Sequence, residues 1–356
     1  MLLGGAVRGR YHHGMDSLTQ IVLGASVAAL AVPAAHRRRA LLAGAALGTL
    51  PDLDVIPLAL LGVDPVTNMT WHRGPSHSLL VLAPLGWLLW LWLKRVWAPV
   101  REAPRAWLLA IQLALLTHPL LDAFTVYGTQ LLWPLPLRPT MWSSLFIIDL
   151  GYTLWLLLGV IVACWLGARP AARTWLLAGV VLSTVYLGWS LVAKALVERE
   201  AARSLAALGL ADAPRFSVPM PFNTLLWRVV AMTPDGFVEG ERSLVADRGP
   251  MRFRHYPSDT RALAEVAHFP AVRRLTWFNH GFMKAEVRDG KLVLSDLRMG
   301  AEPDYTFRFA VAEGGNPHWQ EIVPEQQRWP WSERRALDVL WRRIWAQPEE
   351  SVTGSR

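Results

Sequence analysis

Long apolar runs dominate the first half of the chain. Six of them, of roughly 17 to 24 residues each, are long enough to cross a hydrocarbon layer of about 30 Å as α-helices. These runs cover residues 17–34, 40–61, 77–97, 105–124, 145–168 and 174–197. The pattern predicts an α-helical polytopic membrane domain with about six transmembrane helices.

The pattern changes beyond Glu198, where charged residues become frequent and the apolar runs become short. Alternation of apolar and polar residues is typical of β-strands that bury one face. It is found at residues 225–232, 235–245, 282–299 and 305–312. Asp289 and Gly290 lie between two alternating runs and predict a hairpin turn. These signals favour an antiparallel sheet.

Helical periodicity also occurs in this second half, over residues 258–268 and 332–346, where Ser332 is suited to be an N-cap. Strands and helices mixed in this way indicate an α+β domain. We expect a soluble α+β domain with an antiparallel sheet at residues 201–356, after a transmembrane domain at residues 15–200.

Residues 1–14 precede the first apolar run and are basic and rich in glycine. They lack the apolar segment of a secretory signal. We interpret them as a non-native or disordered extension, with Met15 as the true start, so that His12 and His13 play no part in function.

The composition agrees with a membrane protein, since 53% of the residues are hydrophobic and 19 are Trp. The net charge of +8 reflects Lys and Arg in short loops at residues 37–39, 94–105 and 169–173. By the positive-inside rule these three loops face the cytoplasm, and the other loops and the C-terminal domain face outward. No basic and aromatic pattern indicates nucleic-acid binding.

Acidic residues are rare in the apolar half, where only seven precede Glu198. An ionisable group at membrane depth costs several kcal/mol unless it is paired, hydrated or bound to a cation, so each such group is a functional candidate. Asp52 and Asp54 occur in GTLPDLD, and Asp122 occurs in THPLLD. His118, four residues before Asp122, lies on the same face of a helix, which suits two ligands of one cation.

Each motif also has a plain structural interpretation. The Asp-x-Asp pair after Pro51 could be a turn, and His118 with Asp122 could be a hydrogen-bonded pair that ties two helices together. His72 and His77, in HRGPSHS, could be unrelated loop residues.

The three motifs are expected to meet at one depth. Counted from the basic loops at 1.5 Å per residue, His118 lies roughly 20 Å and Asp52 roughly 18 Å across the membrane, and His77 enters from the outer side. Imidazole and carboxylate groups suit Zn, Mn, Fe or Ni. Their number exceeds the need of one tetrahedral ion, which favours two ions. We expect a divalent metal cofactor, with Zn preferred and Mn or Fe as alternatives.

The segments MDSLTQIVLGA, GTLPDLD, HRGPSHS and THPLLDAFTVYGTQLLWP resemble, in order and spacing, the YdjM-like family of inner-membrane metal-dependent hydrolases. The similarity covers about residues 15–200. It implies a helical membrane core with a metal site, a bacterial or archaeal type of cytoplasmic membrane, and a distant likeness to zinc-dependent phospholipase C and P1-type nucleases. The metal ligands that it implies are Asp52, Asp54, His72, His77, His118 and Asp122.

Four further assignments concern residues near the outer face. Asp149 could be another ligand, a partner that orients a histidine, or a general base, and we assign catalytic roles to Asp149 and Asp54. Arg73 and Arg138 are candidates for binding a substrate phosphate, although Arg at a lipid interface often contacts only headgroups.

Together these features predict a membrane-embedded hydrolase that cleaves a phosphoester of a lipid or lipid-linked substrate at the outer leaflet, with metal-bound hydroxide as nucleophile. The alternatives are a metal or proton transporter and a structural or regulatory membrane protein whose metal only links helices. The polar cluster belongs to the second to fourth spans and is not repeated in the last two, which favours the enzyme over a transporter. Nothing in the sequence assigns an oligomeric state.

Overall fold

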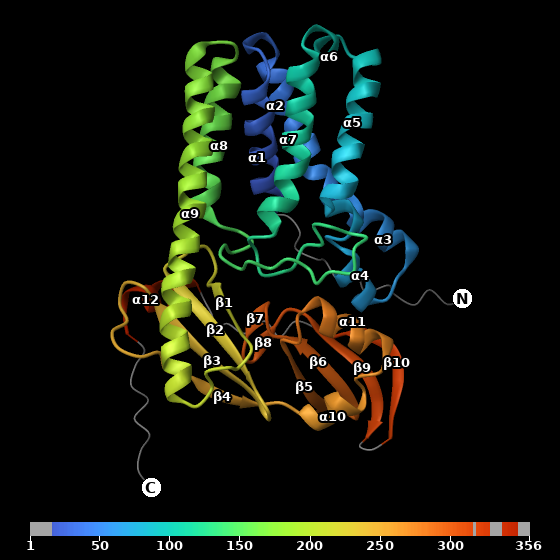
Figure 1. Cartoon of the computed structure of the whole chain (residues 1–356), viewed down its shortest axis with the longest axis vertical. Coiled ribbons are helices and arrows are strands. Elements are labelled where there is room, and N and C mark those ends of the chain that lie inside the picture. Colours follow the sequence, from blue (N-terminus) through green and yellow to red (C-terminus); the bar gives the residue numbers. More distant parts are fainter. Residues whose placement is uncertain (1–15, 316–317, 328–336, 348–356) are drawn as a thin grey trace, which may run out of the picture.

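The computed structural model describes residues 16–315, 318–327 and 337–347, and these form a helical bundle with a β-sheet domain at one end (Figure 1). The expected N-terminal extension and the first part of the helix expected at 332–346 lie outside the described residues. The long helices are α1 (Asp16–Ala31), α2 (Arg37–Thr49), α5 (Leu79–Val96), α7 (Pro104–Asp122), α8 (Leu150–Leu166) and α9 (Pro170–Ala207).

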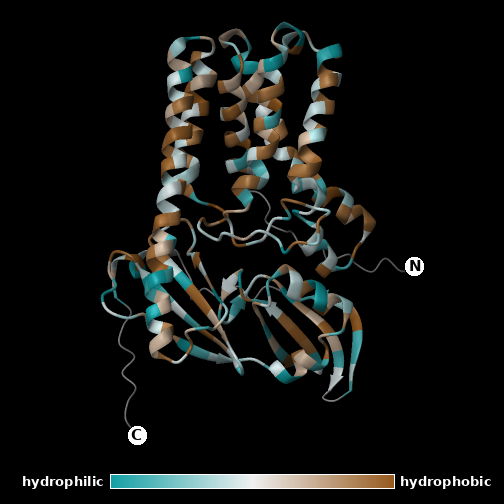
Figure 2. Ribbon diagram, viewed as in Figure 1, coloured by the Kyte–Doolittle hydropathy of each residue, from teal (hydrophilic) through white to brown (hydrophobic). Residues whose placement is uncertain are grey.

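Hydrophobic residues occur along most of the length of the helices of the bundle (Figure 2). Three segments, Ala34–Leu61, Leu79–Val96 and Pro170–Ala207, are long and apolar enough to cross a membrane. Two further apolar helices, Leu18–Ala31 and Leu150–Leu166, are shorter. A helical N-terminal half with apolar spans is therefore confirmed, and the full set of six spans stays a prediction.

The run at residues 40–61 does not form one straight helix. Helix α2 ends at Thr49, a tight 3-10 turn η2 (Leu50–Asp54) follows, and α3 (Val55–Leu61) turns away from the bundle (Figure 1). Pro51 lies in η2 and has no amide hydrogen with which to continue the helical ladder. The break leaves two carboxylates, Asp52 and Asp54, at the end of the bundle.

Helices α1 and α2 pack backbone against backbone at three glycines. A Cβ atom added to Gly24 would lie 2.4 Å from the carbonyl oxygen of Gly44, and one added to Gly48 would lie 2.4 Å from that of Gln20. Small residues permit such close approach of helices in membranes. This contact holds the Gly48 carbonyl group and Gln20 close together at the end of the bundle where η2 begins.

The three basic connections of the bundle meet at its other end. The Arg37 guanidinium donates from Nη1 to the carbonyl oxygen of Gly167 at 2.8 Å, which joins the α1–α2 and α8–α9 connections. His36 Nε2 lies 2.9 Å from a carboxylate oxygen of Glu102 in α6 (Ala98–Glu102). The three basic loops therefore lie at one end of the bundle, and their expected position on the cytoplasmic face of the membrane stays a prediction.

The described residues of the C-terminal half form two four-stranded antiparallel sheets and a two-stranded one, so the expected α+β domain with antiparallel pairing is confirmed. The first sheet consists of β1 (Arg215–Pro219), β2 (Leu226–Thr233), β3 (Gly236–Ser243) and β4 (Arg254–Pro257), in that order. The second has the order β10-β9-β6-β5, with β5 (Met283–Arg288), β6 (Lys291–Asp296), β9 (Arg308–Gly315) and β10 (His318–Gln326). The pair β7 (Gly300–Ala301) and β8 (Asp304–Tyr305) forms the third sheet.

The Asp289–Gly290 turn joins β5 to β6 as predicted, with Arg288 paired to Lys291. Both turn residues have a positive φ, 51° and 73°, as this kind of tight hairpin requires. The domain also contains the helices α10 (Thr260–Glu265), α11 (Pro270–Phe278) and α12 (Leu337–Trp345).

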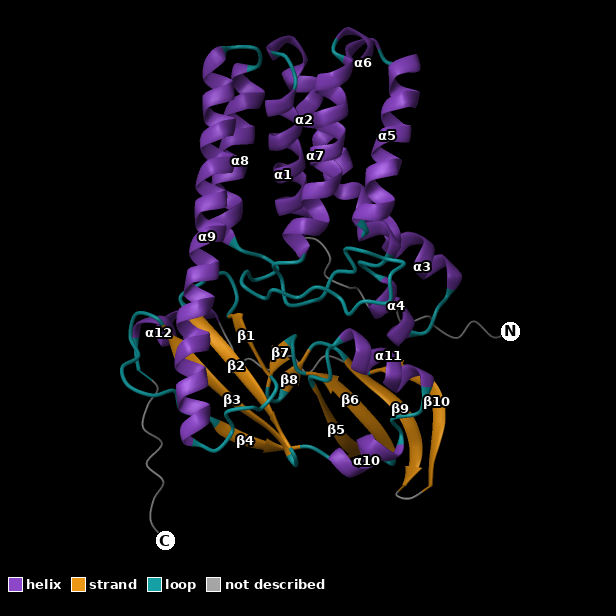
Figure 3. Cartoon of the chain, in the orientation of Figure 1, coloured by secondary structure: helices purple, strands orange, loops and turns teal. Residues whose placement is uncertain are grey.

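The helical half and the sheets share a hydrophobic core. Between the bundle and the sheets lie α4 (Pro65–Trp71) and an extended segment, residues 123–149, drawn as loop in Figure 3. From these segments Val66 and Tyr127 are buried in one cluster with Leu275 and Phe278 of α11. Helix α9 runs without interruption past the expected boundary at residue 200.

Arg298 connects this extended segment to the sheets. Its side chain is buried, and its guanidinium donates to Asp296 Oδ2 at 2.6 Å, to the carbonyl oxygen of Tyr127 at 2.8 Å and to that of Phe278 at 3.1 Å. A buried ion pair with all its hydrogen bonds made is costly to break from one side, because the partner charge is left uncompensated.

We therefore expect Arg298→Met to cost about 3 to 5 kcal/mol, since Asp296 would stay buried without its cation. That loss corresponds to a fall of roughly 5 °C or more in the melting temperature of the purified protein, followed by intrinsic fluorescence. Arg261→Met is the matched control, because the Arg261 side chain is 79% exposed. Equal melting temperatures for the two variants would show that Arg298 does not hold the two halves together.

Candidate metal centre

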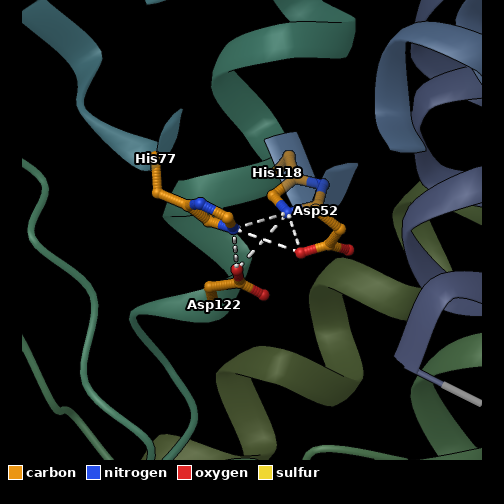
Figure 4. A group of neighbouring side chains, drawn as sticks. All are labelled: Asp52, His77, His118 and Asp122. Atoms are coloured by element: carbon orange, nitrogen blue, oxygen red, sulfur yellow. Dashed lines mark hydrogen bonds and ion pairs between the residues drawn. The ribbon is translucent and has the colours of Figure 1, made fainter. Parts of the chain in front are cut away.

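Four side chains from three separate segments point toward one centre at the sheet end of the bundle (Figure 4). Asp52 comes from η2 and His77 from a second 3-10 turn, η3 (Pro75–His77). His118 and Asp122 lie one turn apart on α7. The convergence expected from the sequence is therefore present for these four residues, which form a possible metal-binding group.

The four ligand atoms are spaced as the corners of a coordination shell. His77 Nε2 lies 3.3 Å from Asp52 Oδ1 and 3.2 Å from Asp122 Oδ2, and His118 Nε2 lies 3.4 Å from each of these oxygens. The two Nε2 atoms are 3.1 Å apart. Ligands held about 2.0 to 2.2 Å from a common ion lie about 3.0 to 3.4 Å from one another, in tetrahedral or adjacent octahedral positions.

The tautomer of His118 is set by the backbone. Its Nδ1 lies 2.6 Å from the carbonyl oxygen of Gly48, which can only accept a hydrogen bond. Nδ1 therefore carries a hydrogen, and when the ring is neutral its lone pair is on Nε2. The close packing of α1 and α2 at Gly48 thus orients a ligand on α7.

The tautomer of His77 is set by a chain of two hydrogen bonds. The Ser76 hydroxyl donates to Asp54 Oδ2 at 2.6 Å, so its oxygen is free to accept from His77 Nδ1 at 2.9 Å. His77 then also presents a lone pair on Nε2. Outer partners of this kind are typical of histidines that bind metals.

When both rings are neutral, four electron-pair donors face one another, and each Nε2 atom lies 3.1 to 3.4 Å from the other three ligand atoms. Three of the residues, His77, His118 and Asp122, are at most 1% exposed, so water does not relieve their repulsion. Asp122 Oδ2 is buried and accepts no hydrogen bond from any described side chain. A divalent cation at the common centre satisfies all four groups, so the residues present fit such an ion.

Asp122 is held in place from its other side. Gln20 Nε2 donates to Asp122 Oδ1 at 2.8 Å. Arg73 Nε lies 3.3 Å from Asp122 Oδ2, and Arg73 Nη1 donates to Thr125 Oγ1 at 3.0 Å. Arg73 is 2% exposed. The guanidinium therefore contacts a metal-site carboxylate inside the protein, and its expected contact with a substrate phosphate stays a prediction.

Asp54 and His72, two further expected ligands, form a separate pair beside the group of four. Asp54 Oδ1 lies 2.9 Å from His72 Nδ1, and Asp54 Oδ2 also accepts from Ser76. Their side chains are 13% and 15% exposed, more than those of His77 and His118. In the described part of the chain one group of four suits a metal ion, and the expected second ion stays a prediction.

Asp149 and Arg138 lie elsewhere. Asp149 is buried as the N-cap of α8, where Oδ1 accepts from the Tyr152 amide at 3.1 Å and Oδ2 from the Tyr186 hydroxyl at 3.2 Å. Arg138 is exposed and lines a cleft with His280. The structure brings neither residue into the group of four, and their expected roles stay predictions.

Sequence reasoning missed two residues that support the site. Gln20 and Ser76 are polar residues within MDSLTQ and HRGPSHS. The sequence gives these residue types but does not indicate their hydrogen-bond partners. Tyr127 is buried and donates to the carbonyl oxygen of Met69 at 2.8 Å. Burial raises the pKa of Tyr127 above its usual value, so the hydroxyl stays protonated and keeps this bond.

An apolar helical bundle that encloses two histidines and two aspartates defines an integral membrane protein with a candidate divalent metal centre. The chain belongs to the YdjM inner membrane protein family, whose model matches residues 15–197. This family and the apolar helices fit a location in the inner membrane. No curated protein and no solved structure matches the chain.

We expect Ser76→Ala to weaken metal binding roughly 10- to 100-fold, because His77 Nδ1 loses the partner that fixes its tautomer. Affinity for Zn and Mn is measured by competition with a chelator on the purified full chain. Ser183→Ala is the control, since the hydroxyl of Ser183 also makes a hydrogen bond inside the protein but donates it to the carbonyl oxygen of Tyr152. The tautomer argument fails if the two variants bind metal equally well.

Proposed function

We propose that this protein is a membrane-embedded, metal-dependent hydrolase that cleaves a phosphoester of a lipid or lipid-linked substrate. The observation that carries the proposal is the group of four ligand atoms, with both imidazole tautomers set for coordination, at one end of an apolar bundle. When bound there, a divalent ion supplies Lewis-acid polarisation of a phosphoryl oxygen and activation of water.

Proton transfer is assigned to the pair formed by Asp54 and His72. The Asp54 carboxylate orients the His72 imidazole through the 2.9 Å contact at Nδ1, and His72 then acts as the general base. Asp54 is also linked through Ser76 to the metal-site residue His77. The side chains of Asp54, His72 and also Asp52 (13%, 15% and 18%) are more exposed than those of His77 and His118, so a substrate reaches the site from the side of these three residues.

A lipid substrate is supported by the apolar surface next to the site. Helix α3 follows directly after the turn that carries Asp52, and it exposes Ile56, Leu60 and Leu61 at 54%, 82% and 74%. Such a contiguous apolar surface suits contact with acyl chains. With six spans and the basic loops in the cytoplasm, the site opens toward the outer leaflet.

A metal that only links helices is the second candidate. All four ligands come from the protein, and closed four-ligand sites are typical of structural zinc. In that case metal removal lowers stability, and no hydrolysis accompanies metal binding.

The test combines metal analysis with hydrolysis of defined lipids by the purified full chain. Elemental analysis gives the ion and its stoichiometry, and release of phosphate or diacylglycerol from phosphatidic acid and phosphatidylglycerol gives the activity. We expect His118→Ala to lose both metal and activity. We expect His72→Gln to keep the metal and lose roughly 100-fold or more in kcat, as for loss of a general acid or base.

Two outcomes would contradict the proposal. A protein that stays inert with added Zn or Mn, although metal raises its melting temperature, has the structural metal of the second candidate. Uptake of labelled metal into liposomes that His118→Ala abolishes would indicate a transporter. Arg261→Gln, on the exposed surface of α10, is the control for preparation effects.

A further inference from the structure

A polar cleft lies where α9 meets the sheets, and it shares no residue with the candidate metal group. Its volume is about 410 Å³. The residues that matter for its chemistry are Arg138, Lys194, Glu198, Arg215 and His280, which line it together with Phe216 and Phe282. They come from α9, β1, the extended segment after α7 and the turn before β5.

Lys194 holds the walls of the cleft together. Its ammonium donates to Ser217 Oγ at 2.7 Å, to the Ser217 carbonyl oxygen at 2.9 Å and to Ser143 Oγ at 3.1 Å. Glu198 lies one turn further on α9 and accepts from the hydroxyl of Ser217 at 2.6 Å. These bonds join α9, β1 and the extended segment, so the cleft is formed without a ligand.

Positive charge exceeds negative charge in the cleft. Three cations, Arg138, Lys194 and Arg215, face one carboxylate, that of Glu198. Arg215 contacts Glu198 through Nε at 3.2 Å, and its Nη groups have no hydrogen bond to a described residue. Arg138 has neither a hydrogen bond nor an ion pair within the described part of the chain. Guanidinium groups with unused donors suit a phosphate.

His280 adds a polar ring without a further charge. Its Nε2 donates to the carbonyl oxygen of Pro139 at 2.9 Å, which fixes the ring beside Arg138. Burial and the nearby positive charges of Arg298 and Arg138 hold the pKa of His280 below its usual value. Because the His280 ring is neutral, the positive charge of the cleft comes from its three basic side chains.

The position of the cleft along α9 corresponds to the headgroup level of a membrane. No charged residue occurs between Arg173 and Lys194, a stretch of about 20 residues that rises about 30 Å, the thickness of the hydrocarbon layer. Lys194 is therefore the first charge beyond that layer. Leu137 and Trp142, on the segment that carries Arg138, are 53% and 43% exposed, as suits contact with lipid at this level.

We propose that this cleft binds the phosphate of an anionic membrane lipid, with Arg138 and Arg215 as the groups that contact it. The bound headgroup anchors the sheet end of the protein to the membrane surface. This inference is independent of the hydrolase proposal, since it uses none of the metal-site residues.

The test is a titration of the full chain in neutral detergent with short-chain phosphatidylglycerol, short-chain phosphatidylcholine or inorganic phosphate, with bound lipid counted by native mass spectrometry. We expect phosphatidylglycerol to bind more tightly than either of the others. We expect Arg138→Gln with Arg215→Gln to weaken its binding roughly 10- to 30-fold, since each basic side chain near a membrane surface contributes about a factor of five.

The matched control is Arg261→Gln with Arg288→Gln, which removes the same charge from exposed positions, 79% and 48%. The control is expected to bind as the wild type does, and all variants are expected to keep their metal content. Should loss of Arg215 impair folding, Arg138→Gln alone carries the test, with a loss of roughly threefold or more. Equal loss in the control, or equal binding of the two lipids, overturns the proposal. Inorganic phosphate that binds as tightly as phosphatidylglycerol overturns the lipid assignment.

Discussion

Two imidazoles and two carboxylates meet at one end of an apolar bundle, where each Nε2 atom lies 3.1 to 3.4 Å from the other three ligand atoms, and the local structure is arranged around this contact. In a medium of low polarity such groups repel unless a cation lies between them. Four neighbouring contacts orient the ligand atoms toward their common centre. The Gly48 carbonyl group and Ser76 fix the rings of His118 and His77, and Gln20 and Arg73 fix the carboxylate of Asp122.

The packing of α1 against α2 contributes to the orientation of these ligand atoms. Glycines let α1 and α2 approach closely, which brings the Gly48 carbonyl group to His118 and the Gln20 amide to Asp122. Pro51 interrupts the helix at the point where a carboxylate has to turn toward α7. A straight helix over residues 40–61 would carry Asp52 past this position, so the broken span is a condition for the site.

The sheets belong to this arrangement because they cover the segments that carry the site. Arg298 reaches from the sheets to the carbonyl group of Tyr127, and the Tyr127 hydroxyl reaches the backbone at Met69, shortly before His72. The candidate metal group and the polar cleft at Arg138 and Lys194 thus both involve segments that lie between the bundle and the sheets.

The sequence by itself determined the helical and β-rich halves, the Asp289–Gly290 hairpin and the four residues of the candidate metal group, because these follow from local periodicity, turn chemistry and the cost of charge in an apolar run. It did not separate Asp54 and His72 from the other ligands. That separation depends on the partners of each side chain, such as the contact between His72 Nδ1 and Asp54 Oδ1, which lie 18 residues apart along the chain. Only the tertiary structure could decide it, since the partners of a polar side chain are set by packing between segments and not by neighbours in the sequence.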